Sequence, residues 1–182
     1  LIAYAKANPG KVAFGSSGVG AAAHLTSELL QHTAGVQMIH VPYKGTAPAL
    51  ADLMANNIQL LVDVPSSMMS QVRAGKVNAL AMFADKRLPS ASEVPTIVEA
   101  GGPPIESSSW VMYFAPPGTP PAIVDKISKA VAEALQSPEI VARFNELGII
   151  PMGKNPAETA KFLNDEVAKW GKVITQANVK AE

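Results

Sequence analysis

Residues 12–24 of this chain read Val12-Ala-Phe-Gly-Ser-Ser-Gly-Val-Gly-Ala-Ala-Ala-His24, and they predict a short strand, a glycine-rich loop and the start of a helix. Small residues leave the loop backbone open to a ligand, and the first N–H groups of a helix have no intrahelical partners. Such a turn, at the positive end of a helix dipole, suits a carboxylate or a phosphate. A tight strand-to-helix connection without any ligand explains the same residues, so both interpretations stay open at this point.

Three enzymatic motifs fail on spacing in this loop. A nucleophile elbow needs Gly-x-Ser-x-Gly, but with Ser17 at its centre the last position is Val19, and with Ser16 the first is Phe14. A phosphate-binding P-loop ends in Gly-Lys-Ser/Thr, and no lysine follows Gly20. The glycine spacing of the dinucleotide fingerprint is reversed here. A general anion-binding turn is the functional interpretation that survives.

The composition is that of an ordinary globular protein, with 48% hydrophobic residues among 182. Fifteen basic and fifteen acidic residues cancel, so no long-range field favours nucleic acid or an anionic membrane. The absence of cysteine excludes disulfides and thiolate sites, and three histidines at unrelated spacings give a metal site little support. The opening residues 1–10 resemble the last turns of a helix without a capping residue, so we expect a fragment or a processed chain.

Strands and helices alternate along most of the chain. This alternation predicts an α/β fold, with a mostly parallel sheet flanked by helices and a helical C-terminal portion. Three helix starts are marked by capping residues next to proline, at Thr119, Ser137 and Asn155. The strands are expected at 12–15, 38–41, 60–63, 79–83 and 110–115, and the helices at 21–34, 46–56, a stretch ending near Arg73, a short stretch at 96–100, 119–136 and 156–178, besides a helix after Ser137.

Three loops follow strands of this predicted parallel sheet, at 15–20, 42–45 and 63–67. In open α/β sheets, ligands bind in the crevice outside the carboxyl ends of the strands. The common position of the three loops therefore favours a ligand site over a plain connection.

Several motifs recur in order along the whole chain. They are Gly15-Ser-Ser-Gly, His24-Leu-Thr-Ser-Glu-Leu, His40-Val-Pro-Tyr-Lys-Gly, Ala74-Gly-Lys, Val94-Pro-Thr-Ile-Val-Glu-Ala-Gly, Ser109-Trp, Ala115-Pro-Pro-Gly-Thr-Pro and Glu166-Val-Ala-Lys-Trp. In these motifs the chain resembles the Bug-type periplasmic substrate-binding proteins of tripartite tricarboxylate transporters.

The resemblance implies a type II periplasmic-binding-protein fold, the two-domain Venus flytrap. The receptor would capture a small carboxylate in the periplasm and present it to membrane permease subunits. Residues 1–108 would form the second α/β domain, and residues 109–182 the crossing strand and C-terminal helices that normally complete the first. In the family, an N-terminal segment forms the other ligand wall, and none of the motifs quoted above belongs to that segment. The family commonly carries polar residues where this chain has Val19, Ala21 and Ala22, so backbone N–H groups must contribute more, or the ligand is less polar than a tricarboxylate.

The expected ligand contacts lie mainly in the three loops. In the first loop the serine hydroxyls and the backbone N–H groups would bind a carboxylate, although Ser17 capping of the helix is compatible with this. In the other loops, Lys44 would neutralise a carboxylate or simply be solvated, and Asp63 would accept from a ligand hydroxyl or ammonium or cap the next helix. The complete set is Ser16, Ser17, Gly18, Gly20, Ala21, Tyr43, Lys44, Gly45, Asp63 and Trp110, the last as a cleft wall or a buried strand residue.

Two other classes of function stay open beside this binding protein without catalysis, cofactor or metal. A serine-dependent hydrolase would use Ser17 with His24, but no third member is evident, and His24 is expected to be a neutral packed side chain. A non-catalytic assembly module would use the apolar stripes of the C-terminal helices. Because those stripes need a surface to cover, we also expect a homodimer through these helices.

Overall fold

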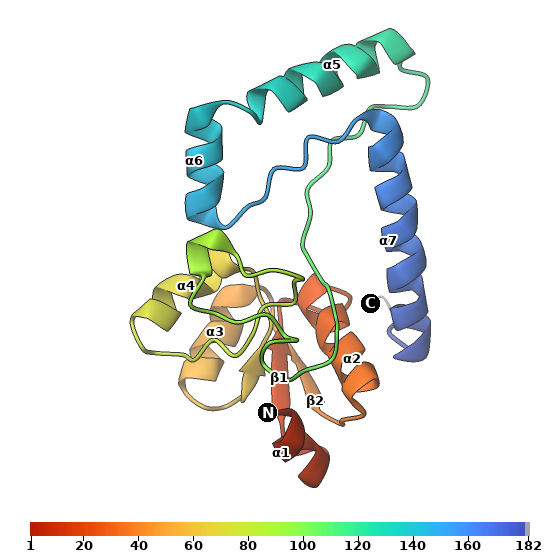
Figure 1. The fold of residues 1–182 in the computed structure, drawn as a ribbon. Helices are drawn as coiled ribbons and strands as arrows, with labels where there is room; N and C mark the ends of the chain where they lie inside the picture. Colours follow the sequence, from red (N-terminus) through yellow and green to blue (C-terminus); the bar gives the residue numbers. More distant parts are fainter. Residues whose placement is uncertain (181–182) are drawn as a thin grey trace. The chain divides into compact units, whose positions relative to one another are not determined.

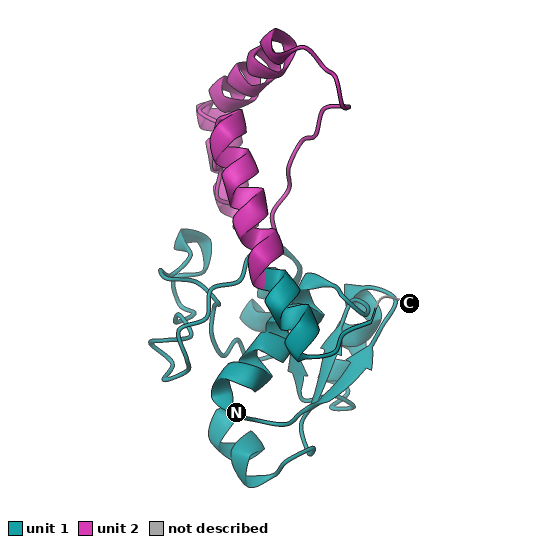
Figure 2. Cartoon of the chain, turned by 90° about the vertical axis from the view of Figure 1, so that its right-hand side faces the viewer, with its two compact units in different colours: residues 1–109, 170–182 teal, residues 110–169 magenta. Residues whose placement is uncertain are grey.

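The computed structural model describes residues 1–180 and divides the chain into two compact units. Residues 1–109, together with the described residues from 170 onward, form the first unit, and residues 110–169 form the second (Figure 2). The first boundary lies next to the expected one at residue 108, whereas residues 170–180 join the first unit. The assignment of these parts to the two domains of a flytrap stays a prediction.

The first unit is built on a three-stranded parallel sheet in the order β2-β1-β3 (Figure 1). Phe14, at the centre of β1, is paired with His40 on one side and Leu60 on the other. Helices α2 and α3 both contact β1. The elements are α1 (Ile2–Ala7), β1 (Ala13–Ser16), α2 (Ala22–Ala34), β2 (Ile39–Pro42), α3 (Thr46–Met54), β3 (Leu60–Leu61) and α4 (Pro65–Arg73).

The boundaries of this part follow from local chemistry. Gly35 ends α2 in the left-handed conformation, with φ of 63°, as its position after the apolar stripe predicts. Val12 and Phe14 of the first strand region are buried because parallel strands are covered on both faces. Two buried clusters hold the unit together, one of Ala5, Val12 and Val36 and one of Leu30, Ile97 and Ile105. The expected α/β arrangement is therefore confirmed.

Two elements expected between residues 79 and 100 are wrong. Residues 79–83 form no strand, because only Met82 bridges to Thr96, through bonds to the backbone of Pro95 and Ile97. Residues 96–100 form turns rather than a helix, since Glu99 accepts from the Thr96 N–H and the chain bends at the glycines that follow. A short 3-10 helix, η1 (Pro89–Ala91), lies between these segments.

The second unit consists of an extended segment and helices α5 (Pro121–Ala134), α6 (Pro138–Leu147) and the first part of α7 (Pro156–Gln176). The strand expected at 110–115 is wrong, because no other strand pairs with these residues within 1–180. Val111 is 97% exposed and Phe114 70% exposed. A run of β-forming residues needs a partner strand to hydrogen-bond with, and composition alone does not supply one.

One of the three expected helix caps is confirmed. Asn155 and Glu158 form a reciprocal capping box, in which each side chain accepts from the other residue's N–H at 2.9–3.0 Å. Thr119 instead donates to the Pro116 carbonyl, and Ser137 precedes α6 without a side-chain cap. Proline at the first helical turn begins both α5 and α6, which explains why these helices begin where expected.

Within residues 1–180, no helix combines the length and the apolar character that a membrane crossing requires. The same residues contain no group of three or more His, Cys, Asp or Glu side chains with the arrangement of a metal site.

Candidate functional site

The three loops at the carboxyl ends of the strands are joined by direct hydrogen bonds. Tyr43 donates its N–H to the Ser16 carbonyl at 3.0 Å, and Gly45 donates to the Ser17 carbonyl at 3.3 Å. Thr46, at the start of α3, donates its hydroxyl to Asp63 Oδ2 at 2.6 Å. The prediction that these loops lie together is confirmed, and their mutual bonds make one continuous rim on this edge of the sheet.

The first loop uses several of its N–H groups internally. Gly18 donates to the Ser16 hydroxyl at 3.3 Å, Gly20 to His24 Nδ1 at 3.0 Å, and Ala21 to the Gly18 carbonyl at 3.3 Å. Gly20 has a φ of 76°, which other residues rarely adopt. The amides of Gly18, Gly20 and Ala21, expected to bind a carboxylate, are thus already bonded, and their assignment to a ligand needs correction.

Three neighbouring amides are available instead. The N–H groups of Val19, Ala22 and Ala23 have no hydrogen-bond partner among residues 1–180. Ala22 and Ala23 open α2, where helical N–H groups are unpaired by geometry. Ala22 is exposed, so an anion can reach its amide. Val19 lies within the expected range of Gly18 to Ala21, and the other two donors lie just beyond its end.

The two serines of this loop differ in position. Ser16 is completely buried, and its hydroxyl bonds to Gly18 and lies 2.6 Å from His40 Nε2, so a ligand contact would require this network to open. Ser17 is partly exposed and makes no side-chain hydrogen bond among the described residues. It does not cap α2 either, since Ala21 is the N-cap and no side chain bonds there. The capping interpretation is wrong, and the ligand contact of Ser17 stays a prediction.

In the second loop, the Tyr43 hydroxyl donates to Asp52 of α3 at 2.7 Å. This hydrogen bond raises the pKa of Tyr43 to about 12, so the phenol stays neutral. Lys44 is exposed and makes no ion pair or hydrogen bond among residues 1–180, which leaves its ammonium free for solvent or ligand. The Gly45 N–H bonds to the first loop and is not available.

Asp63 organises the third loop. Besides Thr46, its carboxylate accepts from the Val64 N–H at 2.7 Å and from the Ser67 hydroxyl at 3.1 Å. Val64 rather than Asp63 is the N-cap of α4. Asp63 therefore connects β3 to the starts of α3 and α4, and a ligand would add to these bonds rather than replace them.

Two histidines that are not among the expected ligand residues form a stacked column beneath the first loop. The rings of His24 and His40 are 3.8 Å apart and nearly parallel, at 9°, and Phe14 stacks on His40 at 4.9 Å. Burial lowers the pKa of His24, and burial together with the nearby His24 lowers that of His40 to about 4. The expectation of a neutral, hydrogen-bonded His24 is confirmed. The strand register that pairs Phe14 with His40 is the signal that would have placed His40 here.

Trp110 belongs to the second unit, whereas the residues of the rim belong to the first. Its indole N–H donates to Glu166 Oε2 at 3.0 Å, and its ring meets Phe162 edge to face at 5.9 Å. A role as a cleft wall stays a prediction.

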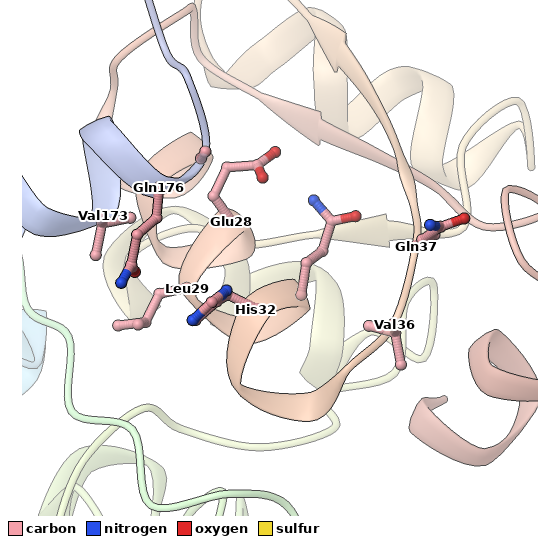
Figure 3. A pocket seen from close by; sticks show the side chains of 9 residues that line it. Glu28, Leu29, His32, Val36, Gln37, Val173 and Gln176 are labelled. Carbon is pink, nitrogen blue, oxygen red and sulfur yellow. The ribbon is translucent and has the colours of Figure 1, made fainter.

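A pocket of about 400 Å³ lies in the first unit between α2 and the last turns of α7 (Figure 3). Glu28, Leu29 and His32 of α2 face Val173 and Gln176 of α7 across it. None of the expected ligand residues lines this pocket. The connected loops and free amides on the sheet edge, rather than this pocket, have the chemistry of an anion site.

Comparison with known proteins supports the resemblance in the motifs. Residues 1–179 match the family described as tripartite tricarboxylate transporter family receptor. BugT of Bordetella pertussis is 35% identical over 180 residues, covering 99% of this chain and 55% of BugT. The chain spans about half the length of BugT and of most other curated relatives it matches.

Two solved structures with bound ligands have the same fold. An R. palustris protein with adipate has a TM-score of 0.86 and 36% identity, over 98% of this chain and 60% of that one. MatC from Rhodopseudomonas palustris with bound malate has a TM-score of 0.78 and 30% identity, over 95% of this chain and 60% of that one. The chain therefore belongs to the tripartite tricarboxylate transporter receptor family, as a Bug-type protein with the α/β fold of periplasmic binding proteins.

Proposed function

We propose that this chain acts in a periplasmic receptor that captures a small carboxylate for the membrane permease subunits of a tripartite transporter, without catalysis. The observation that carries this proposal is the set of free amides at Val19, Ala22 and Ala23 on the rim of joined loops. Each offers a hydrogen bond to an anion at the positive end of α2, where the helix dipole adds to the attraction.

The ligand class follows from the donors. Hydrophobic or small side chains at Val19, Ala21 and Ala22 offer no polar atoms of their own, so recognition depends on backbone N–H groups and on Lys44. Such a rim favours a ligand with one terminal carboxylate, and it tolerates apolar groups in the rest of that ligand. The related structures bound to adipate and to malate are consistent with a dicarboxylate.

A catalytic role receives no support from the same loop. Ser17 and His24, the candidate pair of a hydrolase, are not hydrogen-bonded to each other, because His24 Nδ1 accepts from Gly20. The Ser16–His40 pair is close, but Ser16 is completely buried and a nucleophile must be reached by its substrate. Hydrolysis of a model ester that disappears in the Ser17→Ala variant would overturn this part of the proposal.

Removal of one N–H group tests the anion site directly. Ala22 is the first helical residue after Ala21, whose φ of −63° and ψ of 156° are compatible with a following proline. Ala22→Pro therefore deletes one donor while α2 is retained. Ala22→Ser is the matched control, because it keeps the N–H.

The experiment is isothermal titration calorimetry, in which adipate and malate are titrated into the full-length protein. Loss of a hydrogen bond to a charged acceptor should weaken the binding of Ala22→Pro roughly tenfold or more. Ala22→Ser should bind nearly as tightly as the unchanged protein. Equal affinities for both variants would contradict the proposed site. No binding of any mono-, di- or tricarboxylate would contradict the proposed function.

We also propose that the 182-residue chain associates into a homodimer through its C-terminal helices. Ile127 on α5 is 52% exposed and Val167 on α7 is 65% exposed. Soluble monomers rarely leave such stripes in water. Light scattering should give twice the monomer mass, and Val167→Glu should reduce it. A compact monomer at high concentration would refute the dimer.

A further inference from the structure

The histidine column is hydrogen-bonded to the loop that precedes the donors of α2 and contains Val19. His24 lies in the first turn of α2, and His40 lies in β2. Neither side chain is among the groups proposed to contact the ligand. Both are tied to glycines of the first loop. His24 accepts from the Gly20 N–H, and His40 reaches Gly18 through the Ser16 hydroxyl.

The hydrogen bonds assign the protons of both rings. Because His24 Nδ1 accepts from Gly20, its proton is on Nε2, which faces Glu28 Oε1 at 3.6 Å. The Ser16 hydroxyl accepts from the Gly18 N–H and has a single hydrogen, so when that hydrogen is donated to the Gly18 carbonyl, the hydroxyl accepts from His40 Nε2. An accepting Nδ1 makes His24 neutral with a fixed tautomer, and burial, which lowers the pKa of His40, keeps that ring neutral as well.

We propose that His24 and His40 are positioning residues that hold the first loop in the conformation that binds the carboxylate. This inference rests on the proposed function. Val19, whose amide is free, lies between Gly18 and Gly20, and the column fixes both of its neighbours. A loop fixed on both sides presents its donors without an ordering cost when the anion arrives.

The geometry also makes the loop sensitive to acid. A protonated His24 carries hydrogens on both nitrogens and can no longer accept from Gly20. Two imidazolium rings 3.8 Å apart would also repel each other. The titratable groups that face His24 are Glu28 on the same helix and His40 on β2, while Phe14 and Ser16 of β1 carry no charge. The lowered pKa of both histidines keeps the column neutral at neutral pH.

Isosteric substitutions separate the effect of a lost hydrogen bond from the effect of a changed side-chain volume. The amide group of asparagine reaches the place of Nδ1, and that of glutamine reaches the place of Nε2. At position 24 the bond uses Nδ1, so His24→Asn should keep the Gly20 bond and His24→Gln should lose it. At position 40 the bond uses Nε2, so His40→Gln should keep the Ser16 bond and His40→Asn should lose it.

The experiment measures adipate and malate affinity of these four variants in the protein at its full expressed length. At pH 7 the two variants that keep the bond should bind within about threefold of the unchanged protein, and the other two should bind about tenfold more weakly. As the pH falls below the ordinary histidine value of 6.5, the unchanged protein should lose affinity relative to His24→Asn, since that variant cannot titrate at position 24. Protonation of the ligand affects both proteins equally and cancels.

The outcomes are distinct. If the unchanged protein binds carboxylates but asparagine and glutamine are equivalent at each position, this inference is overturned while the proposed function stands. If the unchanged protein binds no carboxylate, the proposed function fails. Amide hydrogen exchange at Gly20 then tests the column without any ligand, because protection should fall in His24→Gln and persist in His24→Asn, and equal protection in both refutes the role of His24.

Discussion

Acidification should destabilise the first unit well before its carboxylates are protonated. The fall of the His40 pKa from 6.5 to about 4 corresponds to about 3 kcal/mol, at about 1.36 kcal/mol for each unit. Above pH 6.5, His40 is neutral in both the folded and the unfolded chain, so the fold has its full stability. As the pH falls towards 4, His40 binds a proton in the unfolded chain but not in the folded chain, so the free energy of unfolding decreases.

Carboxylates act in a different range. The pKa values of Glu93 and Glu99 are lowered in the fold by backbone hydrogen bonds first and by arginines next. Their stabilisation is complete above the unfolded value of 4.5 and is lost as the pH falls through the folded values. Burial raises the pKa of Glu28, which opposes the histidine effect because the folded chain then binds a proton more readily. Changes between pH 6.5 and 4.5 that depend on His40 therefore identify the column.

Urea unfolding followed by circular dichroism measures this effect. His40→Gln keeps a donor to Ser16 and does not titrate, so it removes the His40 contribution to the pH dependence and loses only ring stacking at every pH. Relative to its own value at pH 7, the unchanged chain should lose about 2 to 3 kcal/mol more than His40→Gln at about pH 4.5. The same loss in both proteins would show that His40 is not held neutral by the fold, and the reasoning would fail.

Three substitutions test the fold, two in the first unit and one at the start of α7. Gly15→Ala should lower the free energy of unfolding in urea by about 1 to 3 kcal/mol, because the new Cβ would lie 2.6 Å from Ile58 Cδ1. An unchanged unfolding midpoint would show that the core rearranges to accommodate the methyl group. Gly35→Ala should cost about 1 kcal/mol, since alanine must adopt a φ of 63°, and no loss would contradict the left-handed cap. Asn155→Ala should lower the free energy of unfolding by about 1 kcal/mol and speed amide exchange at Glu158, which accepts and donates in the capping box; unaltered exchange would refute that box.

The sequence predicts the first unit well as far as Arg73, because glycines, prolines and short apolar runs specify local structure there. Between Arg73 and Pro121 two expected strands and one expected helix are wrong, whereas the three helices that follow lie where proline and capping residues predict them. Residues 79–83 and 110–115 have the composition of strands, but a strand exists only where another backbone hydrogen-bonds to it. Composition cannot show whether that backbone is present, and Val111, 97% exposed, illustrates the difference.

The candidate site shows the same division between local and non-local information. The position of the three loops follows from the order of strands, and sequence reasoning found it. The availability of each N–H group depends on where a side chain of another element lies. Gly20 is unavailable because His24 accepts from it, and Gly18 because Ser16 does, and no spacing rule contains either fact.

A single physical cause connects the neutral histidines to the proposed anion site. His24 lies in the first turn of α2, where the partial positive charge of the helix disfavours an imidazolium. The same partial charge would attract a carboxylate to the N–H groups of Ala22 and Ala23, which are donors of the proposed site. A cationic side chain at position 24 would neutralise an anion more strongly, but it could not accept from Gly20 and would leave the loop unsupported. The chain therefore combines a neutral acceptor below the loop with free backbone donors on it, so that the charge in this part of the site comes from the ligand.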